Sequence, residues 1–402
     1  MLALMIFSAT YLVLAVGHLP GFRIDRTGAA IIGASLMIGS GALSVEEAVQ
    51  AIDFATLLLL FGMMIVVANL RLSGFFRWAS AWALHHARGP HTLLAAVVAL
   101  AGVFSAFFVN DTICLVLTPL VLDITRAMGR NPVPYLLAVA MASNAGSVAT
   151  ITGNPQNMMI GSLSRIPYAQ FAAALAPVAV GSLLLTFLVI ALIYRRELST
   201  ALPANGEMPR ARLNRALLWK SAAAALGMLV FFFAGWPVAK VAIVAGGLLL
   251  VTRRVKPEKV YLEIDWPLLA LFAGLFVVVA GMEKTSLDEN LFRVASRFRL
   301  GNVWVLSGFS ALVSNLVSNV PAVLVFRPLM DHLPYPSQGW LTLAMSSTLA
   351  GNLTILGSVA NLIVVQRARR EVRISFWDYL KAGLPLTLLS LALGAAWLQG
   401  VP

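Results

Sequence analysis

Long apolar stretches separated by short polar ones set the pattern of this chain. A helix that crosses the hydrocarbon core of a bilayer needs about 20 apolar residues. Stretches of roughly that length lie at residues 2–19, 27–43, 54–70, 134–163, 169–194, 214–234, 237–253, 266–282, 339–365 and 376–398. The pattern therefore predicts an all-α polytopic membrane protein.

Two further apolar stretches, 91–126 and 302–332, are interrupted at their centres by polar residues. The interruptions fall at 109–112 and at 318–321. Each half of such a stretch is too short to cross the bilayer comfortably. Backbone that is not helical persists at membrane depth only where protein or a water-filled cavity surrounds it. We therefore expect two re-entrant helical hairpins whose tips lie inside the membrane.

The two halves of the chain repeat the same order of elements. After each predicted hairpin comes a long apolar stretch, 134–163 or 339–365, that small polar residues interrupt. Identical residues align in these stretches without a gap: Ser143, Thr150, Ile151, Gly153 and Asn157 with Ser347, Thr354, Ile355, Gly357 and Asn361. This match predicts a transmembrane helix that is broken at the same place in each half.

Each half contains an odd number of full-length stretches, so two homologous halves must sit upside down relative to each other in the bilayer. This is the inverted-repeat plan of secondary transporters, whose sites lie near the midplane where broken helices meet. We expect the first five-span repeat at 1–196, a polar cytoplasmic linker at 197–213 and the second five-span repeat at 214–402.

Composition and charge agree with a membrane protein and exclude other classes. Of the 402 residues, 59% are hydrophobic and 11% are charged, whereas soluble domains carry about 25% charged residues. The net charge of +12 would suggest a nucleic-acid partner in a soluble protein, but most of the 29 Lys and Arg residues fall in loops on one predicted side. Because basic loops stay in the cytoplasm, we expect both termini on the periplasmic side of a bacterial inner membrane and no nucleic-acid binding.

The two hairpin tips and the two broken spans supply the candidate chemistry. A new helix start offers free N–H groups to an anion, and a new helix end offers carbonyl oxygens to a cation. Candidates for binding substrate are Asn110, Thr112, Thr152, Asn154, Asn157, Ser318, Asn319, Thr354, Ser358 and Asn361. Candidates for binding Na⁺ or for coupling a proton are Asn110, Asp111, Gly153, Ser318, Asn319 and Gly357.

Asp111 falls at membrane depth, whereas every other Asp and Glu lies in a predicted loop or near the end of a span. A carboxylate at that depth is costly and marks an ion or proton path by default. The alternative is structural, with Asp111 capping the second arm of the hairpin. The chain has no His-Glu-x-x-His motif, no pair of buried acids and no Ser-His or Cys-His set at depth. We therefore expect no enzyme, no cofactor and no metal site other than one for Na⁺.

Four stretches carry a resemblance to a known group: FSAFFVNDTICLVLTPLV, SNAGSVATITGNPQNMMIG, LVSNVPAVLVFRPLM and LAGNLTILGSVANLIV. They resemble the ion transporter superfamily, which holds divalent anion:sodium symporters, citrate carriers, arsenite permeases and one class of sodium–proton antiporter. Bacterial citrate-transporter-like permeases look most similar, over nearly the whole chain. The resemblance implies an elevator-type motion of the hairpins and broken spans against a scaffold, and a homodimer built through that scaffold.

Two departures from the group bear on the coupling ion. The dicarboxylate symporters carry Ser-Asn-Thr at both tips, whereas this chain reads NDT at 110–112 and SNV at 318–320. The arsenite and antiporter branch reads Gly-Asp-Pro in the broken span, whereas this chain reads GNP at 153–155. Losing that carboxylate weakens the antiporter interpretation, because proton exchange needs titratable groups.

The leading expectation is a secondary active transporter that moves a small anion, a carboxylate or an inorganic oxyanion, coupled to Na⁺ or H⁺. Two alternatives stay open. One is a sodium–proton antiporter that works through Asp111, and the other is an efflux permease for arsenite or antimonite. The expected partners are the lipid bilayer, the small anionic substrate and a second copy of the chain.

Overall fold

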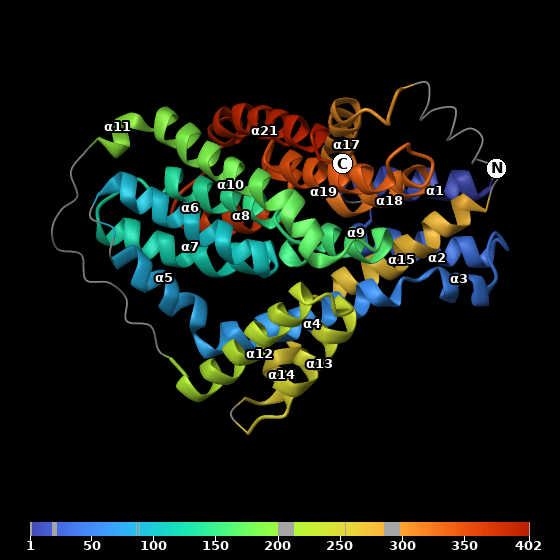
Figure 1. The fold of residues 1–402 in the computed structure, drawn as a ribbon, viewed down its shortest axis with the longest axis horizontal. Helices are drawn as coiled ribbons and strands as arrows, with labels where there is room; N and C mark the ends of the chain where they lie inside the picture. The colour runs from blue at the N-terminus through green and yellow to red at the C-terminus, as the bar shows by residue number, and fades with distance from the viewer. Residues whose placement is uncertain are drawn as a thin grey trace.

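The computed structural model describes residues 2–17, 22–85, 87, 89–199, 213–253, 255–284 and 298–401, and these residues are helical with short connections (Figure 1). The first half contains α1 (Leu2–Val16), α2 (Arg26–Gly39), α3 (Val45–Ala51), α4 (Phe54–Ser73), α5 (Phe75–His85), α6 (Pro90–Phe107), α7 (Asn110–Ala127), α8 (Val133–Ser147), η1 (Ile151–Gly153), α9 (Pro155–Ser164), α10 (Tyr168–Ile193) and α11 (Arg195–Leu198). The second half contains α12 (Arg215–Phe233), α13 (Val238–Leu250), α14 (Pro257–Tyr261), α15 (Trp266–Glu283), α17 (Val303–Val317), α18 (Asn319–Met330), α19 (Pro336–Ala350), η2 (Ile355–Gly357), α20 (Val359–Ala368) and α21 (Phe376–Gln399). Most of the predicted linker, 200–212, lies outside the described residues.

The outer helices present apolar side chains that a water-soluble protein would bury. Six helices of the described residues are long and apolar enough to span a membrane, namely α4, α6, α10, α12, α15 and α21. Leu192 on α10 is 72% exposed and Leu226 on α12 is 64% exposed. Extended apolar surface of this kind requires a lipid or protein environment. The chain is thus an all-helical, multi-span membrane protein.

Helices α1–α4 and α12–α15 form a frame in which each half packs on the other. Helix α4 packs against α13, and α2 packs against α15. A Cβ atom on Gly62 would lie 2.5 Å from the backbone of Ala242, so α4 and α13 approach more closely than any larger residue would permit. Small residues at such crossings let membrane helices gain van der Waals contact where hydrophobic driving force is weak.

Two ion pairs join the halves of the frame at matching places. Arg71, near the end of α4, pairs with Glu263, just before α15. Lys284, just after α15, pairs with Glu47 of α3 through Nζ and Oε1 at 2.6 Å. Each pair links the end of one half's long frame helix to the short segment that precedes the other half's long frame helix.

The polar interruptions of the sequence coincide with breaks in the helices. Stretch 91–126 is divided into α6 and α7, and stretch 302–332 into α17 and α18. Asn110 and Asn319 are the first residues of α7 and α18. The two later stretches are each divided by a short 3₁₀ turn, η1 or η2, and continue as α9 or α20.

Helix α8 lies at the centre of the molecule, and each of its residues is buried. It packs against α6, α7 and α10 of its own half and against α19 and α20 of the other half. Its polar residues Ser143, Asn144 and Ser147 are therefore shielded from both lipid and bulk water. Buried polar groups of this kind need hydrogen-bond partners, and those partners define the candidate site.

Candidate functional site

Local sequence explains why the two long helices break. In the first half, Asn154 has an extended backbone with φ of −155° and ψ of 163°, and Pro155 starts α9. A residue before proline disfavours helical geometry, and proline suits the first position of a helix. In the second half, Ser358 is extended, with φ of −147° and ψ of 144°, and α20 starts at Val359 without a proline. The second break therefore depends more on its tertiary contacts.

Two asparagines hold the breaks by the same bonds in both halves. The Asn157 side-chain nitrogen donates to the carbonyl oxygens of Ser147 and Thr150, at 3.1 Å each. The Asn361 side-chain nitrogen donates to the carbonyl oxygens of Gly351 at 2.7 Å and Thr354 at 3.0 Å. These carbonyls lie where a helix ends and would otherwise lack partners. Both asparagines are fully buried, so the bonds are shielded from water.

Asn144 of α8 is the hub of a buried cluster that both halves build. Its side-chain oxygen accepts from Asn110 Nδ2 at 3.1 Å and from Ser358 Oγ at 3.0 Å. Its side-chain nitrogen donates to the Oδ1 atoms of Asn352 and Asn361, at 3.0 Å each. A side-chain amide has two donor hydrogens and two acceptor lone pairs, so this amide is saturated. We call these five residues the Asn144 cluster.

A second cluster lies around Gln156 of α9. Asn154 Nδ2 donates to Thr348 Oγ1 at 3.2 Å, and Gln156 Nε2 donates to the same oxygen at 3.1 Å. Hydrogen-bond geometry assigns Asn319 the amide orientation in which its oxygen accepts from Gln156 Nε2 at 3.2 Å and its nitrogen donates to Ser347 O at 3.2 Å. We call Asn154, Gln156, Asn319 and Thr348 the Gln156 cluster.

The two clusters contain residues from matching positions of the two aligned stretches. Asn144 and Thr348 occupy matching positions of the aligned stretches, and so do Asn154 and Ser358. In each cluster, the residue that precedes a broken helix bonds to the central buried helix of the other half. A hairpin tip also joins each cluster, through Asn110 in one and Asn319 in the other. The starts of α7 and α20 thus meet at Asn144, and the starts of α9 and α18 meet at Gln156.

The structure brings together most of the predicted substrate residues but separates others. Asn110, Ser358 and Asn361 lie in the Asn144 cluster, and Asn154 and Asn319 lie in the Gln156 cluster. The side chains of the remaining candidates make no hydrogen bond to either cluster: Asn157, Thr152, Thr112, Ser318 and Thr354. Two of these residues reach a cluster through their backbone, since Asn157 N donates to Asn154 Oδ1 and Thr354 O accepts from Asn361 Nδ2. Asn157 braces the first break and Thr152 contacts Tyr168, so both are placed to support the site rather than to line it.

The predicted ion-site glycines occupy crowded turns. A Cβ atom on Gly153 would lie 2.2 Å from the carbonyl oxygen of Ser147. A Cβ atom on Gly357 would lie 2.9 Å from the carbonyl oxygen of Gly351 and 3.0 Å from Asn315 Oδ1. In both turns a backbone carbonyl oxygen lies against a glycine, and oxygen ligands of this kind are those that hard cations such as Na⁺ prefer. Ser147 O and Gly351 O also accept from the side chains of Asn157 and Asn361. The first turn is the tighter of the two.

Neither cluster contains a charged side chain. Asp111, one residue into α7, is half-buried and has no hydrogen bond or ion pair among the described residues. No group of three or more His, Cys, Asp or Glu residues that could hold a metal ion occurs in the described part of the chain. The site therefore consists of neutral amides and hydroxyls, with one unpaired carboxylate beside the first tip.

Sequence reasoning missed Asn144, Gln156, Thr348 and Asn352 as site residues. Each of them lies within the interrupted stretches that the repeat identifies, so their region was predictable. Their partners were not, because Asn144 and Asn352 are 208 positions apart in the chain. Tyr168 was also missed, since an aromatic residue at the start of an apolar span is usually an interface anchor.

Ser318 at the second tip has a backbone conformation that strongly favours glycine. Its φ is 78° and its ψ is 160°, whereas Val109 at the first tip has φ of −52° and ψ of 119°. Such geometry costs a residue with a side chain about 1–3 kcal/mol. We expect Ser318→Gly to raise the midpoint of thermal unfolding in detergent, with Val109→Gly lowering it as the control. A lower midpoint for Ser318→Gly would show that the Ser318 side chain stabilises the tip by more than its strain costs.

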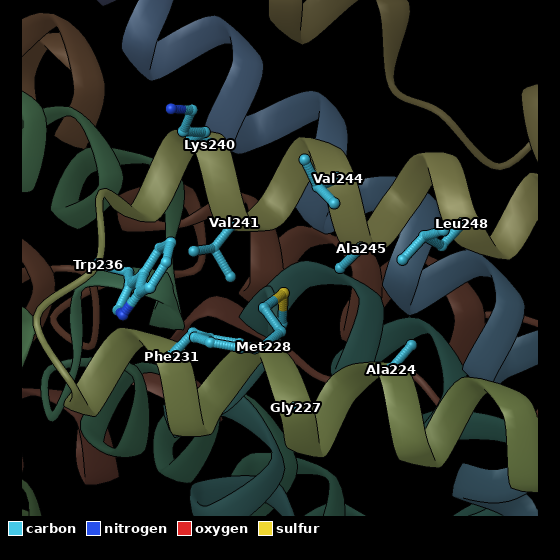
Figure 2. A pocket seen from close by; sticks show the side chains of 10 residues that line it. All are labelled: Ala224, Gly227, Met228, Phe231, Trp236, Lys240, Val241, Val244, Ala245 and Leu248. Carbon is cyan, nitrogen blue, oxygen red and sulfur yellow. The ribbon is translucent and has the colours of Figure 1, made fainter.

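An apolar groove of about 410 Å³ lies apart from both clusters, between α12 and α13 (Figure 2). Ala224, Gly227 and Met228 line it on α12, and Val241, Val244 and Leu248 line it on α13. No residue of either cluster contributes to it. Its walls suit hydrocarbon, so it belongs to the membrane-facing surface of the frame rather than to the polar site.

Comparison with known proteins gives a family match and several relatives. The sequence profile of the Citrate transporter family (CitMHS) matches residues 2–350. The silicon efflux transporter LSI3 of Oryza sativa subsp. japonica is 31% identical, and the alignment covers 96% of this chain and 95% of that protein. The uncharacterized transporter Rv2684 of Mycobacterium tuberculosis is 30% identical, with 98% of this chain and 97% of that protein covered.

Among solved structures, the YdaH transporter of Alcanivorax borkumensis has the same fold. The superposition covers all of this chain and 97% of YdaH, with a TM-score of 0.66 and 14% sequence identity. Because the identity is this low, the similarity shows the fold alone, which is that of a helical, multi-span membrane protein.

Proposed function

The chain belongs to the citrate transporter family and is a secondary transporter rather than an enzyme, and from this premise we propose that it moves a small oxygen-rich anion coupled to Na⁺ or H⁺. The observation that carries this proposal is the meeting of four helix starts at two neutral clusters. Asn110 and Ser358 bring the starts of α7 and α20 to Asn144. Asn319 brings the start of α18 to Gln156 of α9.

Helix starts favour negative charge because their N–H groups and macrodipole point at the ligand. Three of these starts have no side-chain cap: α7 after Val109, α18 after Ser318 and α20 after Ser358. Uncapped N–H groups beside amide and hydroxyl donors suit a carboxylate or an inorganic oxyanion. The clusters are neutral, so the anion would be held by dipoles and would leave more readily than from a Lys or Arg site.

The crowded turns at Gly153 and Gly357 support a cation site beside the anion. Their carbonyl oxygens, with the side chains of Asn110, Ser318 and Asn319, would coordinate Na⁺. Asp111 provides a titratable group near the first tip, which supports a coupling proton as the alternative to Na⁺. A cation placed next to the substrate would link the binding of the two, as symport requires.

The finer architecture belongs to the same proposal. We propose an inverted repeat of two five-span halves, 1–196 and 214–402, in which α6–α7 and α17–α18 are re-entrant hairpins. The hairpins, the broken helices α8–α9 and α19–α20, and their clusters would move as an elevator against the frame. A homodimer in a bacterial inner membrane, with periplasmic termini, completes the arrangement. The repeated ion pairs and repeated break contacts support the pseudo-symmetry.

The direct test is solute flux in liposomes that contain the purified protein. We expect uptake of at least one member of a panel of citrate, succinate, phosphate and sulfate, driven by an inward Na⁺ or proton gradient. Empty liposomes are the control. Absence of gradient-driven uptake across the panel would contradict the anion proposal.

Replacing Asp111 with asparagine distinguishes proton coupling from Na⁺ coupling, because asparagine has nearly the shape of aspartate but no titratable group. If a proton is coupled, we expect the pH dependence of uptake to disappear and the rate to fall at least 10-fold. If Na⁺ is coupled through the amide and carbonyl oxygens, we expect the Na⁺ dependence to persist with a change in apparent affinity below about 10-fold. Proton-gated Na⁺ flux that occurs without any anion, and that Asp111→Asn abolishes, would instead identify a sodium–proton antiporter.

A second candidate is efflux of a small inorganic acid in its uncharged form, with hydroxyl groups on silicon, arsenic or antimony. Two observations favour it: the clusters lack charged side chains, and a relative at 31% identity is a silicon efflux transporter. Neutral arsenite or antimonite would fit the same donors. Expression in an arsenite-sensitive host is the test, with resistance expected if this candidate holds and unchanged sensitivity at confirmed expression excluding it.

A further inference from the structure

Equivalent turns of the two halves have different surroundings. Ile151 and Thr152 in η1 are 1% and 0% exposed. In η2, Leu356 matches Thr152 and is 68% exposed, and Val359 just beyond the turn is 46% exposed. The bonds inside the two breaks are the same, so the difference comes from what packs against them. The first break is thus buried inside the protein, whereas the second lies partly exposed at the surface of the chain.

Tyr168, the first residue of α10, covers the first break. Its hydroxyl lies 2.9 Å from Thr152 Oγ1, and the residue is 2% exposed. Its ring packs against Phe232 and Phe233 at the end of α12, with centroid separations of 5.1 Å to each. Tyr168 therefore connects the broken helix of the first half directly to the frame helix α12.

Among the described residues, the start of α21 has no matching ring contact with the frame, although α21 packs against the second break at Gly383. Phe376 and Trp377 start α21, as Tyr168 starts α10, but they are 48% and 67% exposed. Their rings contact each other edge to face, with centroids 5.4 Å apart. Helix α1, which opens the first half as α12 opens the second, instead reaches a hairpin: the Tyr11 hydroxyl donates to Pro321 O at 3.1 Å.

We infer that Tyr168 is a positioning residue that holds the first break against the frame, and we call its contacts with Thr152, Phe232 and Phe233 the latch. These contacts must separate when the transporter exposes the first break to the solution on one side of the membrane. The inference rests on the proposed function, because it assigns a role to Tyr168 in alternating access. The present structure is then the state with the first break closed and the second open. In the opposite state, Tyr168 leaves Phe232 and Phe233, and the exposed start of α21, with Phe376 and Trp377, packs over the second break.

Cysteine labelling tests the latch without knowledge of the substrate. Cys114 is fully buried, so the parent protein should not react with a membrane-impermeant maleimide. Leu356→Cys reports on the second break and Ile151→Cys on the first, in sealed vesicles labelled from either side. With Tyr168 in place, we expect Leu356→Cys to react at least 10-fold faster than Ile151→Cys. Equal rates would overturn the assignment of the open and closed breaks.

Adding Tyr168→Ala should lower the labelling rate of Leu356→Cys at least 5-fold and raise that of Ile151→Cys. Phe233→Leu, which trims the frame side of the latch, should shift both rates in the same directions. Phe231→Leu is the matched control, because Phe231 lies on the same turn of α12 and packs on Trp236 instead. Tyr168→Phe keeps the ring contacts with α12 but loses the hydroxyl contact with Thr152, so it should shift both rates in the same directions by a smaller factor.

The outcomes separate the latch from the proposed function. Unchanged labelling in Tyr168→Ala, with the parent protein transporting normally, would overturn the latch and leave the transport proposal intact. Shifted labelling in a protein that moves no anion would support the latch and contradict the choice of substrate. A uniform rise of both rates in Tyr168→Ala and in Phe231→Leu would mean general loosening and would also overturn the latch.

Discussion

Replacing Asn144 with alanine is expected to abolish transport, with a loss of at least 100-fold, and to lower thermal stability. The change removes one hydrogen bond from each of four buried partners: Asn110, Ser358, Asn352 and Asn361. A buried polar group without a partner costs about 1–3 kcal/mol, and hydrogen bonds between membrane helices contribute about 0.6–2 kcal/mol each. We expect a total loss of about 2–4 kcal/mol, measured by thermal unfolding in detergent beside flux in liposomes.

Asn69→Ala is the matched control for this experiment. Asn69 is also a fully buried asparagine, on α4, but its side chain makes one bond, to Ile65 O in its own helix. Its removal strands no side chain of another element, so transport should stay within about 3-fold of the parent. If both variants lost transport to the same extent, burial rather than the cluster would explain the Asn144 effect, and the hub would be disproved.

Gly153→Ala is expected to have the second large effect, a loss of transport of at least 50-fold. The added carbon would lie 2.2 Å from Ser147 O, a distance at which backbone must move. That movement would displace Ser147 O from its bond with Asn157 and would shift the start of α9. Flux in liposomes measures the loss, and the amount of protein recovered from the membrane shows whether folding survives.

Gly357→Ala and Gly308→Ala serve as comparisons, because their surroundings are progressively less crowded than those of Gly153. At Gly357 the closest atoms to a new Cβ are 2.9 and 3.0 Å away, so a small shift accommodates it and transport should fall by about 3- to 10-fold. At Gly308, within α17, nothing lies within 4 Å. Alanine there should raise stability by about 0.5–1 kcal/mol, because glycine is unfavourable inside a helix. A larger loss at Gly357 than at Gly153 would contradict the observed asymmetry of the two turns.

Much of the fold follows from periodicity and length alone. The apolar stretches predict the long helices to within a few residues, because lipid solvates a continuous apolar surface and imposes its thickness on each element. The breaks were predictable too, since NDT at 110–112 and GNP at 153–155 interrupt otherwise apolar runs. Polar residues at membrane depth are rare enough that each one marks an exception to regular helix.

The membership of the two clusters was only partly predictable. The repeat predicts Asn110, Asn319 and Asn361 as site residues, because polar residues at matching positions of the two breaks indicate the same role in both halves. It did not lead to Asn144 or Gln156, because which side chains meet depends on how the halves pack, and α8 and α20 come together from distant parts of the chain. The sequence also predicts two equivalent breaks, whereas Tyr168 makes them unequal through contacts with α12.

The tight crossing of α4 and α13 has a consequence for how the protein is made. Gly62 and Ala242 touch, yet 180 residues of chain separate them. At about 5–20 residues per second of synthesis, α4 must wait about 10–40 s in the membrane before its partner emerges from the ribosome. During that interval its crossing face and Arg71 remain without their final neighbours. Lipid or the insertion machinery must therefore cover the α13-facing surface of α4 during this interval. If the first half were released before the second half is made, this surface would remain exposed.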